Sequence, residues 1–69
     1  MEEFLHQLVF LHLDLRGKDF FYVCAYVKAI SETHITIVDK TKTKEEQQSI
    51  SYRKIDIIEI KLSNRKAHE

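Results

Sequence analysis

The chain has 69 residues, of which 43% are hydrophobic and 32% are charged, with eleven basic and eleven acidic side chains. This composition is typical of a globular protein and excludes a disordered polyelectrolyte. The balanced charge also argues against strong non-specific binding to nucleic acid, which needs an excess of basic residues.

The first half of the chain predicts a short helix followed by two strands. Glu2 to Leu8 opens with acidic residues, which complement the helix dipole, and its apolar residues share one helical face. From Val9 to Leu15 apolar residues alternate with period two, as in a strand with one buried face. Arg16 to Asp19 holds the only glycine, Gly17, which tolerates the positive φ of a tight hairpin turn. Asp19 to Ser31 then predicts a long strand, apolar on both faces in its early part.

The second half predicts three shorter strands, over His34–Lys40, Gln48–Tyr52 and Ile57–Ser63. The hydrophilic segment Thr41–Gln48 predicts a solvated hairpin loop, and residues 64–69 predict a flexible tail. A strand-rich chain this short avoids exposed sheet edges by curling into a small barrel. We therefore expect a mainly β fold in which a short N-terminal helix, residues 1–8, precedes a strongly bent, five-stranded antiparallel barrel, residues 9–63.

The segment "ISYRKIDIIEI", Ile50 to Ile60, resembles the end of the Sm-like fold, in the SH3-like class of small barrels. A strand ends in a tyrosine and two basic residues, and an Ile-rich strand follows after a single turn. This is similar to the Hfq-type bacterial RNA chaperones, whose corresponding segment is Tyr-Lys-His, and the upstream order of elements matches as well. The chain departs from the family at Ala25, where a glycine usually bends the second strand, and at Ser31–Thr33, where an Asp or Asn often shapes the RNA pocket.

The resemblance implies a single Sm-like domain over residues 1–69, whose fourth and fifth strands pair between neighbouring subunits to form a ring that binds RNA. Carried over by position, Tyr52, Arg53 and Lys54 would contact phosphates or a base near the pore, and Lys28 is a further candidate RNA contact. The alternative is that the basic pair forms a charged turn, which only blunts an exposed edge strand.

Aromatic residues form a stripe along the long strand at Phe20, Tyr22 and Tyr26. Such a stripe could stack nucleic-acid bases, but large aromatic side chains mainly supply burial and interface energy. We therefore assign these three residues, together with Ile57, to packing under the N-terminal helix or to a subunit interface.

Two further groups of polar residues predict no site. Lys40, Lys42 and Lys44 alternate along a loop, but acidic residues follow at once, which indicates a solvated loop of mixed charge. His12 and His34 could approach each other on neighbouring strands, yet two imidazoles without a third ligand make a poor metal site. We therefore expect no metal and no cofactor.

No catalytic pattern is visible in the sequence. Cys24 lies in an apolar strand interior with no basic neighbour, where burial makes a thiol inert. A nucleophile elbow, a phosphate-cradling glycine loop and a paired-carboxylate pattern are all missing. We expect a small, non-catalytic regulatory protein that binds or associates with RNA as an oligomer. The alternative is a protein–protein interaction module or structural subunit that binds no nucleic acid.

Size and cysteine content bear on partners and compartment. A domain this small usually needs a disulfide, a metal or a partner subunit for stability, and one cysteine cannot form an internal disulfide. This favours a homo-oligomer in a reducing compartment. The longest apolar run is too short to span a membrane, and the N-terminus carries acidic residues where a secretory signal carries basic ones. We expect a cytoplasmic protein with no membrane partner.

Overall fold

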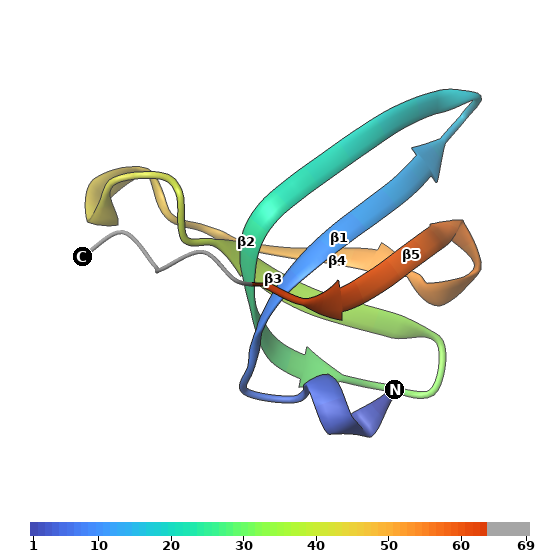
Figure 1. The fold of residues 1–69 in the computed structure, drawn as a ribbon, viewed down its shortest axis with the longest axis horizontal. Helices are drawn as coiled ribbons and strands as arrows, with labels where there is room; N and C mark the ends of the chain where they lie inside the picture. Colours follow the sequence, from blue (N-terminus) through green and yellow to red (C-terminus); the bar gives the residue numbers. More distant parts are fainter. Residues whose placement is uncertain (64–69) are drawn as a thin grey trace.

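The computed structural model describes residues 1–63, and these form one antiparallel sheet of five strands (Figure 1). The strands are β1 (Leu8–Leu15), β2 (Lys18–Ile30), β3 (His34–Asp39), β4 (Ser49–Arg53) and β5 (Ile57–Leu62). Three 3₁₀ turns, η1 (Glu2–Phe4), η2 (Lys44–Glu46) and η3 (Lys54–Asp56), complete the described elements. The predicted mainly β, five-stranded antiparallel fold is confirmed, and each strand begins and ends within one residue of its predicted bounds. The predicted tail lies outside the described residues.

The sheet has the order β4-β3-β2-β1-β5, so the long strands β1 and β2 lie at its centre. Alternation along these strands places one set of apolar side chains on the concave face, as period-two sequences require. The fully buried core cluster consists of Val9, Leu11, Leu13, Ala25, Val27, Ile35 and Ile37. The face opposite this core is called the outer face below.

The β1–β2 hairpin turns through two residues with positive φ, Arg16 (56°) and Gly17 (82°). Positive φ at both central residues is the geometry that matches the right-handed twist of the flanking strands. The backbone N–H of Gly17 also donates a hydrogen bond to Oδ1 of Asp14, at 3.0 Å. The predicted tight turn is therefore confirmed, and it projects the end of the hairpin away from the rest of the sheet (Figure 1).

A β-bulge in the middle of β2 changes which face its side chains occupy. Val9 pairs with Ala25 and Leu11 pairs with Tyr22, so two residues of β2 lie opposite Phe10 alone. An extra residue of this kind bends a strand and increases its twist. As a result Tyr22 and Ala25, three positions apart, both face the core, whereas Tyr26 faces outward. The bend therefore arises without the glycine that the Sm-like pattern places there.

The predicted N-terminal helix from Glu2 to Leu8 is wrong. Only the 3₁₀ turn η1 forms, and Leu8 already belongs to β1. One or two helical turns have little stability of their own. Here the backbone of the N-terminal segment forms hydrogen bonds with β2 instead. The N–H of His6 donates to the carbonyl of Val27 at 2.8 Å, and the N–H of Val27 donates to the carbonyl of Gln7 at 3.0 Å.

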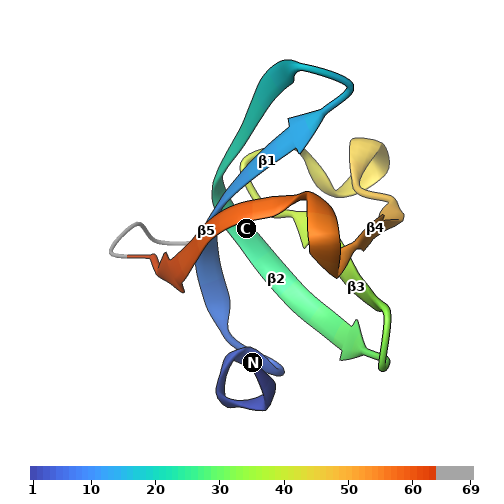
Figure 2. The same cartoon turned by 90° about the vertical axis from the view of Figure 1, so that its right-hand side faces the viewer.

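The predicted closure into a barrel is also wrong, because β4 and β5 are the two edges of an open sheet and do not pair with each other. The sheet is nevertheless strongly bent (Figure 2). Five strands spaced about 4.8 Å apart would span about 19 Å if flat, whereas the turn η3 joins the two edges through only three residues. The facing parts of the bent sheet are held together by core side chains rather than by a backbone ladder.

Candidate functional site

Tyr52, the first of the predicted RNA contacts, points into the core rather than toward a pore. Its hydroxyl lies 2.5 Å from the hydroxyl of Tyr22, and the two rings pack with centroids 5.9 Å apart. Burial, and then the hydrogen bond with Tyr52, raise the pKa of the Tyr22 hydroxyl well above its ordinary value. Tyr52 is thus a structural residue that joins β4 to β2 across the core.

The basic pair on the turn between β4 and β5 is divided between two roles. Arg53 is exposed, and its Nε and Nη2 donate to the two carboxylate oxygens of Asp56 at 3.1 and 3.4 Å. Lys54 is half-buried, and its backbone N–H donates to the carbonyl of Thr33 at 2.9 Å. Ile55, which follows Lys54 on this turn, is 82% exposed and is the most exposed large hydrophobic residue of the described chain. Much of the positive charge that the sequence predicts here is therefore neutralised locally.

Lys28, the remaining predicted RNA contact, is not brought together with this turn. Its Nζ donates to Oγ of Ser49 at 3.1 Å, at the opposite end of β4 from Arg53. Ser49 and Arg53 are four positions apart along β4, which is about 13 Å at the usual rise of a strand. The predicted RNA-binding residues therefore do not form one patch within a single subunit.

The predicted aromatic stripe is split between the two faces of the sheet. The bulge in β2 leaves Phe20 and Tyr22 on the core side and turns Tyr26 to the outer face, so these residues cannot act as one surface. Phe20 is 45% exposed on the projecting hairpin, and Ile57 is half-buried on the edge strand β5. The sequence could not reveal this split, because all residues from Phe20 to Val27 are apolar or aromatic.

The proposed approach of His12 to His34 is wrong, because β2 separates their strands β1 and β3. The His12 ring stacks on Phe21 with centroids 4.2 Å apart, and its Nε2 lies 2.9 Å from Oδ1 of Asp19. Nδ1 of His34 instead shares a hydrogen bond with the hydroxyl of Thr33. Among residues 1–63 no three His, Cys, Asp or Glu side chains are placed to hold a metal ion together.

The two edge strands leave part of the core uncovered. The core cluster is fully buried and comes from β1, β2 and β3 alone. Tyr52 on β4 and Ile57 and Ile60 on β5 pack against this core but are only half-buried. On β5, Ile58 is 55% exposed and Leu62 is 59% exposed. Both edges thus present unpaired backbone groups beside accessible apolar side chains, which is the feature that recruits another strand.

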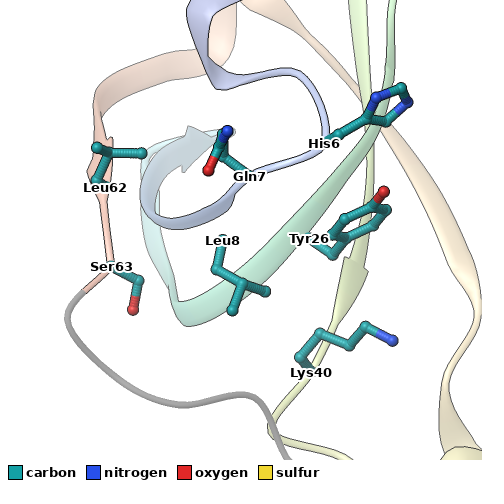
Figure 3. Close-up of a pocket in the computed structure, with 7 residues that line it drawn as sticks. All are labelled: His6, Gln7, Leu8, Tyr26, Lys40, Leu62 and Ser63. Carbon is teal, nitrogen blue, oxygen red and sulfur yellow. The ribbon is translucent and has the colours of Figure 1, made fainter.

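An open pocket of about 540 Å³ lies on the outer face, where the N-terminal segment meets β1 and β2 (Figure 3). It is lined by His6, Gln7, Leu8, Tyr26, Lys40, Leu62 and Ser63. Figure 3 shows Tyr26 and Lys40 on one side of Leu8, with Leu62 and Ser63 on the other. The sequence placed Lys40 at the end of a predicted strand, where a solvated loop begins. Its proximity to Tyr26 follows only from the register in which Tyr26 pairs with Val38, two residues before Lys40.

Comparisons with known proteins place the chain in no family. No family model matches it, and neither does any curated protein or any solved structure. Within residues 1–63 no helix is long and apolar enough to span a membrane.

Proposed function

We propose that this protein is a non-catalytic module that assembles with copies of itself through its edge strands β4 and β5. The observation that carries this proposal is the incomplete burial at both edges, where Tyr52, Ile57 and Ile60 cover the core on one side and remain accessible on the other. A neighbouring strand would satisfy the edge backbone groups and complete this burial at the same time.

The dimensions of the two edges suit each other. β4 has five residues and β5 has six, which gives strands of about 17 and 20 Å. Because the two edges differ, their contact is heterologous, and such contacts produce a ring when the rotation between subunits closes. The Sm-like resemblance implies the same pair of strands, which supports this arrangement for a homo-oligomer.

RNA binding by the assembled protein is the second candidate function. It is favoured by Lys28 and Lys54, neither of which forms an ion pair with any described residue. Repetition around an oligomer would gather these charges, and weak phosphate contacts would then add together. The net charge of zero and the ion pair between Arg53 and Asp56 both weaken the case for RNA binding. Assembly without RNA is therefore the preferred function.

Replacing Ile58 with Lys is expected to prevent assembly while preserving the fold. A lysine on an exposed edge strand opposes the docking of another strand, and Ile58 contributes little to the core because it is 55% exposed. Light scattering over a wide concentration range should show an oligomer for the parent chain and a monomer for Ile58→Lys. Far-UV circular dichroism should be the same for both.

Val23→Lys is the matched control for this experiment, because Val23 is 39% exposed on β2, which is not an edge strand. This variant should assemble like the parent. A parent chain that stays monomeric at every concentration would overturn the proposal. If such a monomeric chain instead binds a different protein through the same edges, the protein is an interaction module for another partner, and the self-assembly proposal is wrong.

RNA binding, where it occurs, is expected to depend on Lys54 more than on Arg53. Lys54→Ala removes a cation without a carboxylate partner, whereas Arg53→Ala removes one that Asp56 already neutralises. For single-stranded RNA each lost phosphate contact reduces the slope of log affinity against log salt by about 0.7. Fluorescence anisotropy at several salt concentrations measures this slope. Equal binding by the parent and both variants would leave the turn between β4 and β5 without a role in RNA recognition.

A further inference from the structure

We propose that the outer-face pocket beside Tyr26 binds a small planar aromatic anion, the chemistry that a nucleoside monophosphate presents. This site shares Leu62 with the end of the edge strand β5, but its polar groups come from the N-terminal segment and from Lys40, directly after β3, and it needs no second subunit. Its volume of about 540 Å³ lies within the roughly 300–1,000 Å³ of small-molecule sites, which combine apolar walls with a few convergent polar groups. Here Leu8 and Leu62 are apolar walls, and Lys40, His6 and Gln7 supply the polar groups.

Lys40 gives the pocket its preference for an anion. Its ammonium group donates one hydrogen bond, to Oε1 of Gln47 at 3.2 Å, and a lysine has three donors. Lys40 forms no ion pair with any described residue, and the residues that line the pocket include no Asp or Glu. A half-buried cation with spare donors, no ion-pair partner and no carboxylate in the pocket lining favours a phosphate or carboxylate group.

The rings of Tyr26 and His6 give the pocket its preference for a flat ligand. They lie nearly parallel, at 15°, with centroids 6.2 Å apart, and the ammonium of Lys40 lies 5.8 Å from the Tyr26 centroid. Tyr26 is half-buried and His6 is exposed, so neither ring is enclosed in the core. The two rings lie too close together to admit a third ring between them, so an aromatic ligand would stack on the accessible side of the exposed His6 ring, with little dependence on its hydrogen-bonding pattern.

The backbone holds His6 in a conformation that its residue type seldom adopts. His6 has a φ of 63°, which is uncommon for residues other than glycine. The hydrogen bonds that join His6 and Gln7 to Val27 fix this geometry and set the imidazole beside Tyr26. Strained residues that their surroundings hold in place occur preferentially at ligand sites.

The test is to titrate the full chain with three probes and to monitor the amide chemical shifts by NMR during each titration. Adenosine monophosphate carries both a ring and an anion, adenosine carries the ring alone, and ribose 5-phosphate carries the anion alone. We expect adenosine monophosphate to shift the amide signals of pocket residues and to bind about tenfold or more tightly than either partial probe, since a charge-assisted hydrogen bond or a stacked base each contributes at least about that factor. A short oligoadenylate then identifies the source of the ligand. Binding by the monophosphate alone indicates a free small molecule, and oligoadenylate binding with the same dependence on Lys40 indicates one nucleotide of a strand.

Lys40→Met keeps an unbranched side chain that is one atom shorter and removes its charge. It should weaken the binding of adenosine monophosphate about tenfold or more. Lys42→Met makes the same charge change two residues away, outside the pocket, and should bind like the parent. Equal affinity of Lys40→Met and Lys42→Met, equal affinity for adenosine and its monophosphate, or shifts confined to residues outside the pocket would overturn the proposal. Light scattering on the same samples reports assembly separately, so failure of this site and failure of the edge-strand proposal are distinguishable.

Discussion

Replacing Leu11 with Ala is expected to remove most of the stability of this protein. Leu11 is fully buried on β1, where it pairs with Tyr22 of β2 on one side and Ile60 of β5 on the other. Truncation of a buried leucine costs about 2–5 kcal/mol through lost burial and the cavity left behind. A 69-residue chain has a total stability of only about 3–10 kcal/mol at the usual value per residue. Urea denaturation followed by circular dichroism measures the loss.

Leu5→Ala is the matched control, because it makes the same truncation at a side chain that is 37% exposed, before β1 and away from both edge strands. It should change the free energy of unfolding by no more than about 0.5 kcal/mol. If the two variants proved equally stable, the core around β1 would be incorrectly placed. Measurement at one fixed protein concentration is necessary, because the proposed assembly would add to apparent stability.

Alkaline pH is expected to weaken the fold through Tyr22. In the folded protein, burial and the hydrogen bond with Tyr52 raise the pKa of Tyr22 above the ordinary value of 10.0. In the unfolded chain the same group ionises near that ordinary value. The contribution of neutral Tyr22 to stability is therefore fully present below about pH 10 and is lost as the pH rises from there toward the folded-state pKa. Thermal unfolding at a series of pH values above neutrality detects this loss, and Tyr22→Phe should reduce it.

Tyr52→Phe separates the hydrogen bond from the burial of Tyr22. At neutral pH it should cost about 1–2 kcal/mol, because it leaves the half-buried Tyr22 hydroxyl without its partner. In a domain of this size each kcal/mol corresponds to about 4–8 °C in Tm. Part of the alkaline loss should persist, since burial is the larger cause of the raised pKa. Tyr26→Phe, which removes a hydroxyl from the outer face, should have little effect at neutral pH. Equal Tm values for Tyr52→Phe and Tyr26→Phe would contradict a stabilising role for the hydroxyl pair.

The strands were predictable from the sequence because their signals are local. Period-two alternation from Val9 to Leu15 and the single Gly17 between two long apolar segments specify a hairpin without any knowledge of the rest of the fold. The bulge opposite Phe10 was not predictable, since Val23 and Cys24 are both apolar and either could face the core. This one extra residue puts Tyr26 and Tyr22 on opposite faces of β2. The strand itself was predicted correctly, and only the faces of its aromatic side chains were wrong.

The candidate sites were less predictable, because they depend on contacts between distant segments. The ion pair of Arg53 with Asp56 spans three residues and was within reach of sequence reasoning. The pocket beside Tyr26 was not, since it requires the backbone bonds of the N-terminal segment to Val27 and the register of β3 against β2. The same backbone bonds explain why Glu2 to Leu8 satisfies a helical pattern and yet forms only a short 3₁₀ turn.

The pairing of β1 with β5, the first and last of the described strands, has a consequence for how the chain is made. β1 is synthesised before the other described strands, but one of its two neighbours, β5, is synthesised after all of them, and only then can Val9 pair with Leu62. Until then β1 has β2 on one side and an open edge on the other, next to apolar side chains that later become the core. Contacts between distant parts of a chain form slowly, and an open apolar edge during that interval can recruit another nascent chain. The interval between the synthesis of β1 and the docking of β5 is therefore when this protein is most exposed to misassembly.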